Sequence, residues 1–101
     1  MSEPPADAET FLAVTDSIAA LQPGLSNLEA GILAALHLSL AADSRSFARI
    51  FGVEHALVLR GVEILCGEAG LLAVTARNPR TQRSRYEPTE AGRAILAHLH
   101  G

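Results

Sequence analysis

Residues 44–66 read SRSFARIFGVEHALVLRGVEILC, and this stretch decides the fold. Its pattern predicts a short helix over residues 44–51 and a longer one over residues 54–66. Gly52 lies between them, and glycine readily takes the positive φ that a sharp turn needs. Apolar side chains stand where the two helices must pack together, namely Phe47, Phe51, Val53 and Val58. Two helices joined in this way form the unit called a helix-turn-helix.

Two further helices are predicted upstream, over residues 5–21 and 27–40. Ser26 and Glu29 have the spacing of a capping box, which marks the start of the second helix. One face of the first helix is apolar at helical spacing. It carries Phe11, Val14, Ile18 and Leu21. This face is predicted to be a dimer interface, because so small a core leaves it uncovered; the alternative is internal packing against the helix over residues 27–40.

Downstream of the quoted stretch, the sequence predicts a β-hairpin followed by a last helix. Residues 71–77 are apolar enough for a strand, and Asn78-Pro79 breaks it. Residues 83–87 read as the returning strand, and Thr89 is placed to cap a helix that runs to about residue 99. The expected fold is therefore mainly α with a small β-hairpin, which would form a wing beside the second helix of the helix-turn-helix.

The charge is divided unevenly along the 101 residues, a length that suits one domain. The net charge of −3 and the pI of about 5.7 argue, taken whole, against nucleic-acid binding. Residues 1–43, however, hold six acids and no Lys or Arg, whereas residues 44–101 hold eight arginines and five acids. Four of these arginines fall within residues 77–85, and no acid stands among them. The basic half therefore coincides with the predicted helix-turn-helix and wing.

Other patterns narrow the class of protein. The single cysteine, Cys66, cannot form an intramolecular disulfide, and the acidic N-terminus lacks the basic start of a signal peptide. The longest apolar stretch, residues 30–42, is too short to span a bilayer, so a cytoplasmic protein is expected. No metal-ligand spacing or catalytic motif is visible. We therefore expect that the protein is not an enzyme and that it binds no cofactor. Cys66 reads as a core thiol, with oxidant sensing as the alternative.

A family resemblance is carried by residues 44–97, which look like a bacterial winged helix of the MarR or PadR type. The segment FARIFGV, residues 47–53, resembles that family's first helix and turn, and VLRGV, residues 58–62, resembles its recognition helix. The segment GLL, residues 70–72, resembles the exit into the wing. The most specific match is YEPTEAGRAIL, residues 86–96, which resembles the return from the wing into the last helix.

This resemblance implies a transcriptional regulator that binds double-stranded DNA as a homodimer. Residues 1–4 would be a disordered tail and residues 5–101 a single winged-helix domain. Within it, residues 5–42 would serve as dimerisation and scaffold helices, 43–70 as the helix-turn-helix, 71–88 as the wing and 89–101 as the C-terminal helix. The helix over residues 54–66 would enter the major groove, and the wing would contact the backbone or the minor groove. The predicted DNA-binding residues are Arg45, Arg49, His55, Arg60, Arg77, Arg80, Arg83 and Arg85.

A rival reading comes from the face of the predicted recognition helix. Glu54 and Glu63 lie on it, and carboxylates are repelled by a phosphate-lined groove. Leu59 and Ile64 are apolar where this class of helix usually carries polar groups. The alternative function is therefore a protein-interaction module that has lost DNA binding. For Arg60, a salt bridge to Glu63 or Glu68 is the alternative to a DNA contact. A small-molecule effector is possible, but the sequence shows no pocket for one.

Overall fold

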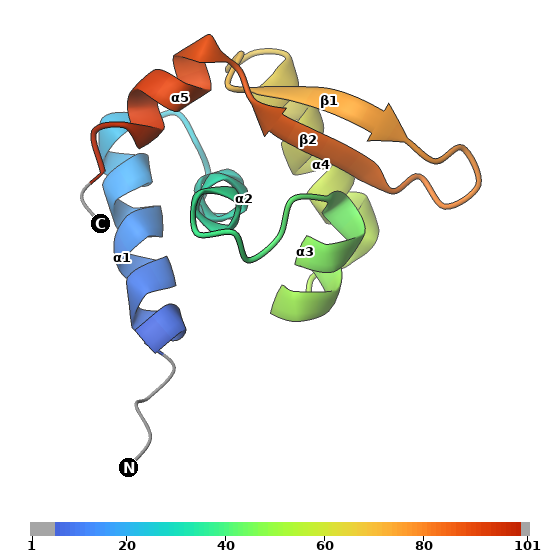
Figure 1. Ribbon diagram of the computed structural model, residues 1–101, viewed down its shortest axis with the longest axis horizontal. Helices are drawn as coiled ribbons and strands as arrows, with labels where there is room; N and C mark the ends of the chain where they lie inside the picture. The colour runs from blue at the N-terminus through green and yellow to red at the C-terminus, as the bar shows by residue number, and fades with distance from the viewer. Residues whose placement is uncertain (1–5, 100–101) are drawn as a thin grey trace.

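The computed structural model describes residues 6–99, so the tail predicted at residues 1–4 lies outside the described part. Five helices and one hairpin follow in the expected order (Figure 1). The elements are α1 (Ala6–Leu21), α2 (Asn27–His37), α3 (Ser44–Phe51), α4 (His55–Cys66), β1 (Leu72–Arg77), β2 (Ser84–Pro88) and α5 (Glu90–Leu96). The prediction of a mainly α fold with a small β-hairpin is confirmed.

Helix α2 is the central helix of the molecule, with α1 on one side and α3 and α4 on the other (Figure 1). Its side chains from Ala30 to Ala35 are buried, which suits a helix that is apolar all round. The capping box predicted at its start is present. The Glu29 amide donates to Ser26 Oγ over 3.2 Å, and the Ser26 amide donates to Glu29 Oε1 over 2.9 Å. The helix ends at His37 rather than residue 40, because Ser39 adopts a positive φ of 61°.

The apolar face of α1 packs inside the chain, against α2. Ile18 is fully buried and Val14 is 7% exposed. Phe11 stacks on Phe51 of α3, with ring centroids 4.6 Å apart. The prediction of a dimer interface on this face is therefore wrong for Val14 and Ile18, since a second copy cannot reach them. Leu21 of the predicted face is 42% exposed, however, and Leu12, which was not part of that prediction, is 60% exposed.

A tight turn joins α3 to α4, as expected. Gly52 has a φ of +66° and stands as the left-handed residue after α3, where glycine carries no steric cost. At the other end of α3, the Asp43 carboxylate accepts the Ser46 amide over 2.8 Å and caps the helix. Phe47 and Val58 are buried between the two helices and the rest of the core.

The hairpin is antiparallel, with Val74 paired to Tyr86 and Arg77 paired to Ser84, and a bulge interrupts the register between Val74 and Ala76. A third segment lies on the free edge of β2, which the sequence did not predict. Asp43 forms an isolated bridge with Arg85, and the Tyr86 amide donates to the Ala42 carbonyl over 3.2 Å. The hairpin is thereby joined to the start of α3.

Helix α5 begins where β2 returns to the core. Thr89 caps it by accepting the Gly92 amide over 3.1 Å, and its hydroxyl donates to the Gly70 carbonyl over 2.7 Å. A side chain at position 92 would collide with the Leu71 carbonyl oxygen, so glycine is required there. The Thr-Glu-Ala-Gly segment thus fastens α5 to the start of β1.

Candidate nucleic-acid interface

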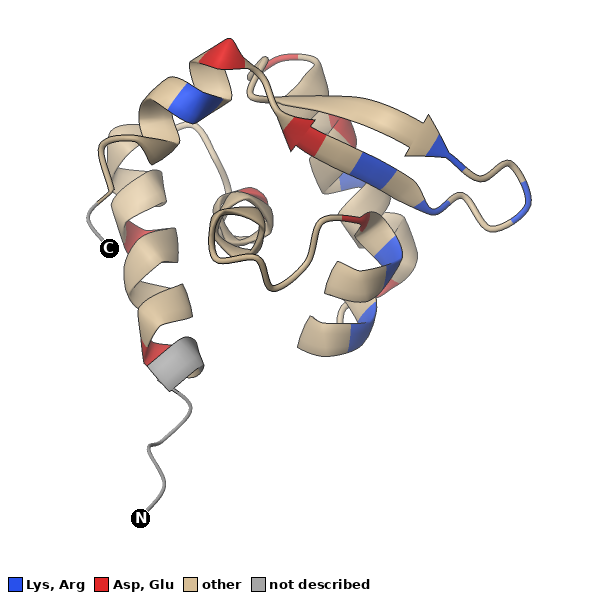
Figure 2. Cartoon of the chain, viewed as in Figure 1, with Lys and Arg blue, Asp and Glu red and all other residues tan. Residues whose placement is uncertain are grey.

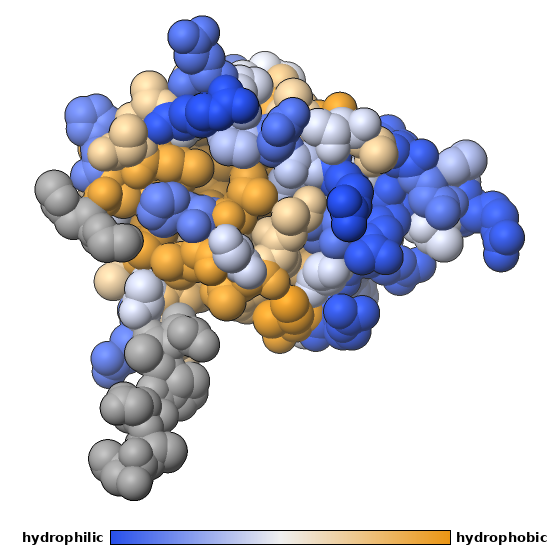
Figure 3. Space-filling view, in the orientation of Figure 1, coloured by the Kyte–Doolittle hydropathy of each residue, from blue (hydrophilic) through white to orange (hydrophobic). Residues whose placement is uncertain are grey.

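The predicted DNA-binding arginines gather on one side of the molecule, over α3, α4 and the hairpin (Figure 2). All seven are exposed to solvent. They come from α3 (Arg45, Arg49), α4 (Arg60) and the hairpin (Arg77, Arg80, Arg83, Arg85). In the space-filling view, hydrophilic side chains cover this side, whereas apolar side chains gather over α1 and α2 (Figure 3). The uneven charge of the sequence is therefore also an uneven charge in space.

The accessible face of α4 mixes charged and apolar side chains. Ala56, Leu57, Arg60 and Glu63 are exposed along it. In the described part of the chain, Arg60 has no carboxylate within 4.0 Å, so the salt bridge considered as its alternative role is not present. Leu59 and Ile64, proposed as docking residues of the rival reading, are half-buried instead.

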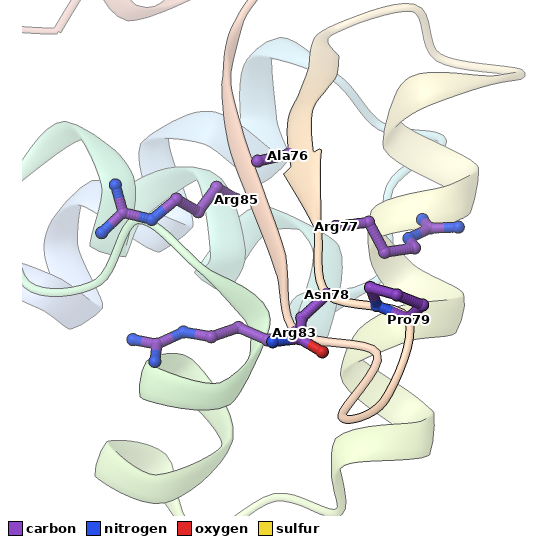
Figure 4. Close-up of a pocket in the computed structure, with 6 residues that line it drawn as sticks. All are labelled: Ala76, Arg77, Asn78, Pro79, Arg83 and Arg85. Carbon is purple, nitrogen blue, oxygen red and sulfur yellow. The ribbon is translucent and has the colours of Figure 1, made fainter.

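The hairpin carries cations on both of its faces. Figure 4 shows Arg77 extending from one face towards α4, and Arg83 and Arg85 extending from the opposite face. Arg77 donates from Nε to Ser84 Oγ over 3.0 Å, which holds it on the side of α4. A shallow hollow lies between these side chains. Because the guanidinium groups diverge, the hollow does not form a single pocket for a small anion.

The loop between the strands is ordered by its own side chains. Asn78 Oδ1 accepts the Arg80 amide over 2.8 Å and the Thr81 amide over 3.2 Å. Gln82 adopts a φ of +64° and donates from Nε2 to the Pro79 carbonyl over 3.1 Å. Arg80 is consequently presented at the tip on a structured turn. The sequence indicated only that Asn78-Pro79 ends the strand.

Arg83 differs from the other hairpin arginines because it is paired with an acid. Its Nε and Nη2 donate to the two oxygens of Asp43 over 2.9 and 3.0 Å. Burial alone would raise the pKa of Asp43, but the hydrogen bonds from Arg83 and Ser46 outweigh it and lower that pKa from 3.8 to about 2. No acid stands among residues 77–85 in the sequence, but in the fold Asp43 forms an ion pair with Arg83.

His55, predicted to contact DNA, is half-buried and contacts a side chain of α3. Its Nε2 lies 2.8 Å from Ser44 Oγ, which also accepts the Ser84 amide over 2.9 Å. Burial, and after it the charge of Arg45, lower the pKa of His55, with Asp43 acting in the opposite direction. A lower pKa favours the neutral ring, and a neutral imidazole can accept a hydrogen bond from the Ser44 hydroxyl.

Arg45 and Arg49 lie one turn apart on α3 and line a surface hollow with Ala48, Val53 and His55. Residues four apart on a helix share a face, so both guanidinium groups border the same hollow. Its lining combines two apolar side chains with two arginines, and arginine side chains can bind a phosphate group. Three of the predicted binding residues, Arg45, Arg49 and His55, therefore line the same hollow.

Other chemistry has less support in the described residues. Cys66 is half-buried, and burial raises the pKa of its thiol, against smaller effects of the Val74 backbone and the charge of Arg77. Between residues 6 and 99, no cluster of three or more His, Cys, Asp or Glu side chains could hold a metal ion. Over the same residues, the helices are all too short or too polar to cross a bilayer.

Comparison of the chain with protein-family models, with curated proteins and with solved structures finds no match.

Proposed function

We propose that this chain is a winged helix-turn-helix protein that binds double-stranded DNA and regulates transcription as a homodimer. In this proposal, α4 is the recognition helix, the hairpin is the wing, and α3 lies across the backbone. The observation that carries the proposal is the gathering of exposed arginines on α3, α4 and both faces of the hairpin. Arginine suits this role because its planar group binds phosphate oxygens in pairs.

The two-sided hairpin favours a groove over a flat surface. Arg77 and Arg85 project from opposite faces, and Arg80 stands at the tip. A minor groove has a phosphate backbone on each side and attracts arginines that enter it. A hairpin that carries cations on both faces can contact the two phosphate backbones of a groove at the same time. A flat acidic protein surface would contact the cations of only one face.

Helix α4 is long enough to read bases. Its 12 residues span about 18 Å, and a helix fits the width of the major groove. Arg60, exposed and without an acidic partner in the described chain, is suited to a bidentate contact with guanine. Glu54 and Glu63 are exposed at the start of this helix and along it; they lower affinity for phosphate in general, and Glu can accept a hydrogen bond from cytosine N4.

The homodimer part of the proposal rests on two accessible leucines of α1, because Val14 and Ile18 of the predicted face are buried. Leu12 and Leu21 are large apolar side chains in solvent, on a helix that carries none of the described arginines. A two-fold pair would set two copies of α4 about 34 Å apart, one turn of DNA, as dimeric helix-turn-helix proteins require.

The test is the salt dependence of binding to mixed-sequence duplex DNA, measured by fluorescence anisotropy. Replacing Arg80 and Arg85 with Ala should weaken binding to all sequences and reduce the slope of log K against log salt by about 0.9 for each phosphate that is no longer neutralised. Arg93→Ala, the same change on α5, is the matched control and should leave the slope unchanged. Absence of any salt-dependent binding by the unaltered protein contradicts the proposal.

The second candidate is a protein-interaction module, and one observation favours it. Ile50 on α3 and Leu57 on α4 are 51% and 50% exposed. Where exposed apolar side chains of neighbouring elements join into one patch, that patch is typical of a protein contact. This candidate is preferred if the intact protein does not bind DNA at low salt.

A further inference from the structure

The base of the hairpin is held by one carboxylate that serves two elements. Asp43 caps α3 through the Ser46 amide and also binds Arg83 through both of its oxygens. Ser46 Oγ completes the cluster by donating to Asp43 Oδ2 over 2.9 Å. The Asp43 side chain is 7% exposed and that of Arg83 46%, so the pair closes over a nearly buried acid. A bidentate pair of this kind fixes orientation as well as distance.

A second connection lies beside the first and reaches α4. Ser44 Oγ accepts the Ser84 amide and contacts His55 Nε2, so it joins α3, β2 and α4 at one atom. Ser44 and Ser84 are both fully buried. Together, Asp43, Ser44, Ser46, His55, Arg83 and Ser84 form a set of contacts that we call the hairpin latch.

The latch lies between the core and the other hairpin arginines, Arg77, Arg80 and Arg85, which have no acidic partner in the described part of the chain. The backbone of Asp43 also forms an isolated bridge with Arg85. Strand β2 and the residue before it are therefore bound to Asp43 through both backbone and side-chain contacts. Arg80 lies farther out, in the loop. A rotation of the hairpin about its base moves the tip most, and opening of the latch would therefore displace Arg80 from its place relative to α4.

We propose that Asp43 and Arg83 are positioning residues for DNA binding. Arg83 acts through Asp43 to hold the hairpin at the angle at which Arg77, Arg80 and Arg85 reach phosphates while α4 is in its groove. This inference rests on the proposed function. In this proposal Asp43 and Arg83 support DNA binding although neither of them contacts the DNA.

Electrostatics makes the proposal easy to distinguish from its simplest alternative. Asp43→Asn removes a negative charge close to the basic surface and frees Arg83, so a purely electrostatic view expects tighter binding to DNA. The latch predicts weaker binding, because the hairpin no longer has a fixed orientation. Asparagine is as good an N-cap as aspartate, so the start of α3 is preserved in this variant.

The experiment compares four variants of the full chain in anisotropy titrations against one duplex at fixed salt. Asp43→Asn and Arg83→Gln should each weaken binding by about tenfold, the effect of removing one charged hydrogen-bonded pair. The double variant should be no weaker than either single one, because both changes open the same contact. Glu87→Gln is the matched control: it removes the same charge from an exposed position on β2 outside the latch, and should bind as tightly as the unaltered protein or more tightly.

Amide hydrogen exchange separates a displaced hairpin from an unfolded chain. In Asp43→Asn, exchange should quicken at the Ser84 and Tyr86 amides, whose acceptors are Ser44 Oγ and the Ala42 carbonyl, and stay slow in the central helix α2. Equal or tighter DNA binding by Asp43→Asn overturns the latch proposal. So does a double variant whose loss of affinity is the product of the two single losses, since Arg83 would then contact DNA directly. If the unaltered protein binds no DNA, the proposed function itself has failed.

Discussion

Tyr86 shows what one buried polar atom contributes. Its side chain is 3% exposed, and its hydroxyl finds no hydrogen-bond partner among residues 6–99. Burial raises the pKa of this phenol, with a smaller effect of the Asp43 charge in the same direction. We expect Tyr86→Phe to stabilise the protein by about 1 kcal/mol, because an unsatisfied buried hydroxyl is removed and the ring is kept. Urea denaturation measures this; a decrease in stability would mean that a buried water serves the hydroxyl.

At the same scale, Arg83 and His55 mark the limit of what the sequence predicts. Both were predicted to contact DNA, but the side chains that they contact within the protein were not predicted. Asp43 and Arg83 are 40 residues apart, and no local pattern connects them. The N-cap role of Asp43, by contrast, depends on a partner three residues away and follows from helix chemistry.

At the scale of elements, the junction between β2 and α5 depends on Gly92. A Cβ there would collide with the Leu71 carbonyl oxygen, which is backbone and cannot rotate away. We expect Gly92→Ala to destabilise the protein by about 2 kcal/mol, the usual cost of overpacking, although alanine favours helix formation. The midpoint of urea denaturation measures the change. Gly24→Ala is the control, because a Cβ at that position meets nothing within 4 Å; equal midpoints for the two variants would contradict the prediction.

Helices and strands could be predicted where their signals are local. Helix α1 shows that its packing partner could not be predicted in this way. The spacing of its apolar residues grouped Val14 and Ile18 on one face, and both are buried, whereas Leu21 of the same predicted face is exposed. It could not identify what covers that face, because periodicity describes a helix and not its neighbour. The third segment on the edge of β2 was missed for a related reason, since a bridge of one residue pair leaves no alternating pattern.

At the scale of the whole molecule, the two halves of the charge distribution suit different contacts. The arginine side suits a polyanion, and the opposite side, over α1, carries Glu9 and Asp16 with exposed leucines. A net charge of −3 therefore does not oppose DNA binding, because acids more than a Debye length away, about 8 Å at physiological salt, are screened from the interface. The acids on α1 do oppose DNA binding in any orientation that places α1 against the phosphates.

This arrangement predicts where two copies meet. We expect Leu12→Glu to convert the proposed dimer to a monomer, because a carboxylate on the outer face of α1 would face its symmetry mate across a two-fold interface. The fold should survive, since Leu12 is 60% exposed and gives little to the core. Sedimentation equilibrium measures the association, and Leu57→Glu, the same change at a leucine 50% exposed on α4, is the control that should still dimerise.

Because a dimer contacts two half-sites, the salt slope for DNA should also fall by about half in the Leu12→Glu monomer. Dissociation of the dimer in Leu57→Glu, with Leu12→Glu unaffected, would instead place the interface on α4 and leave no free recognition helix for DNA.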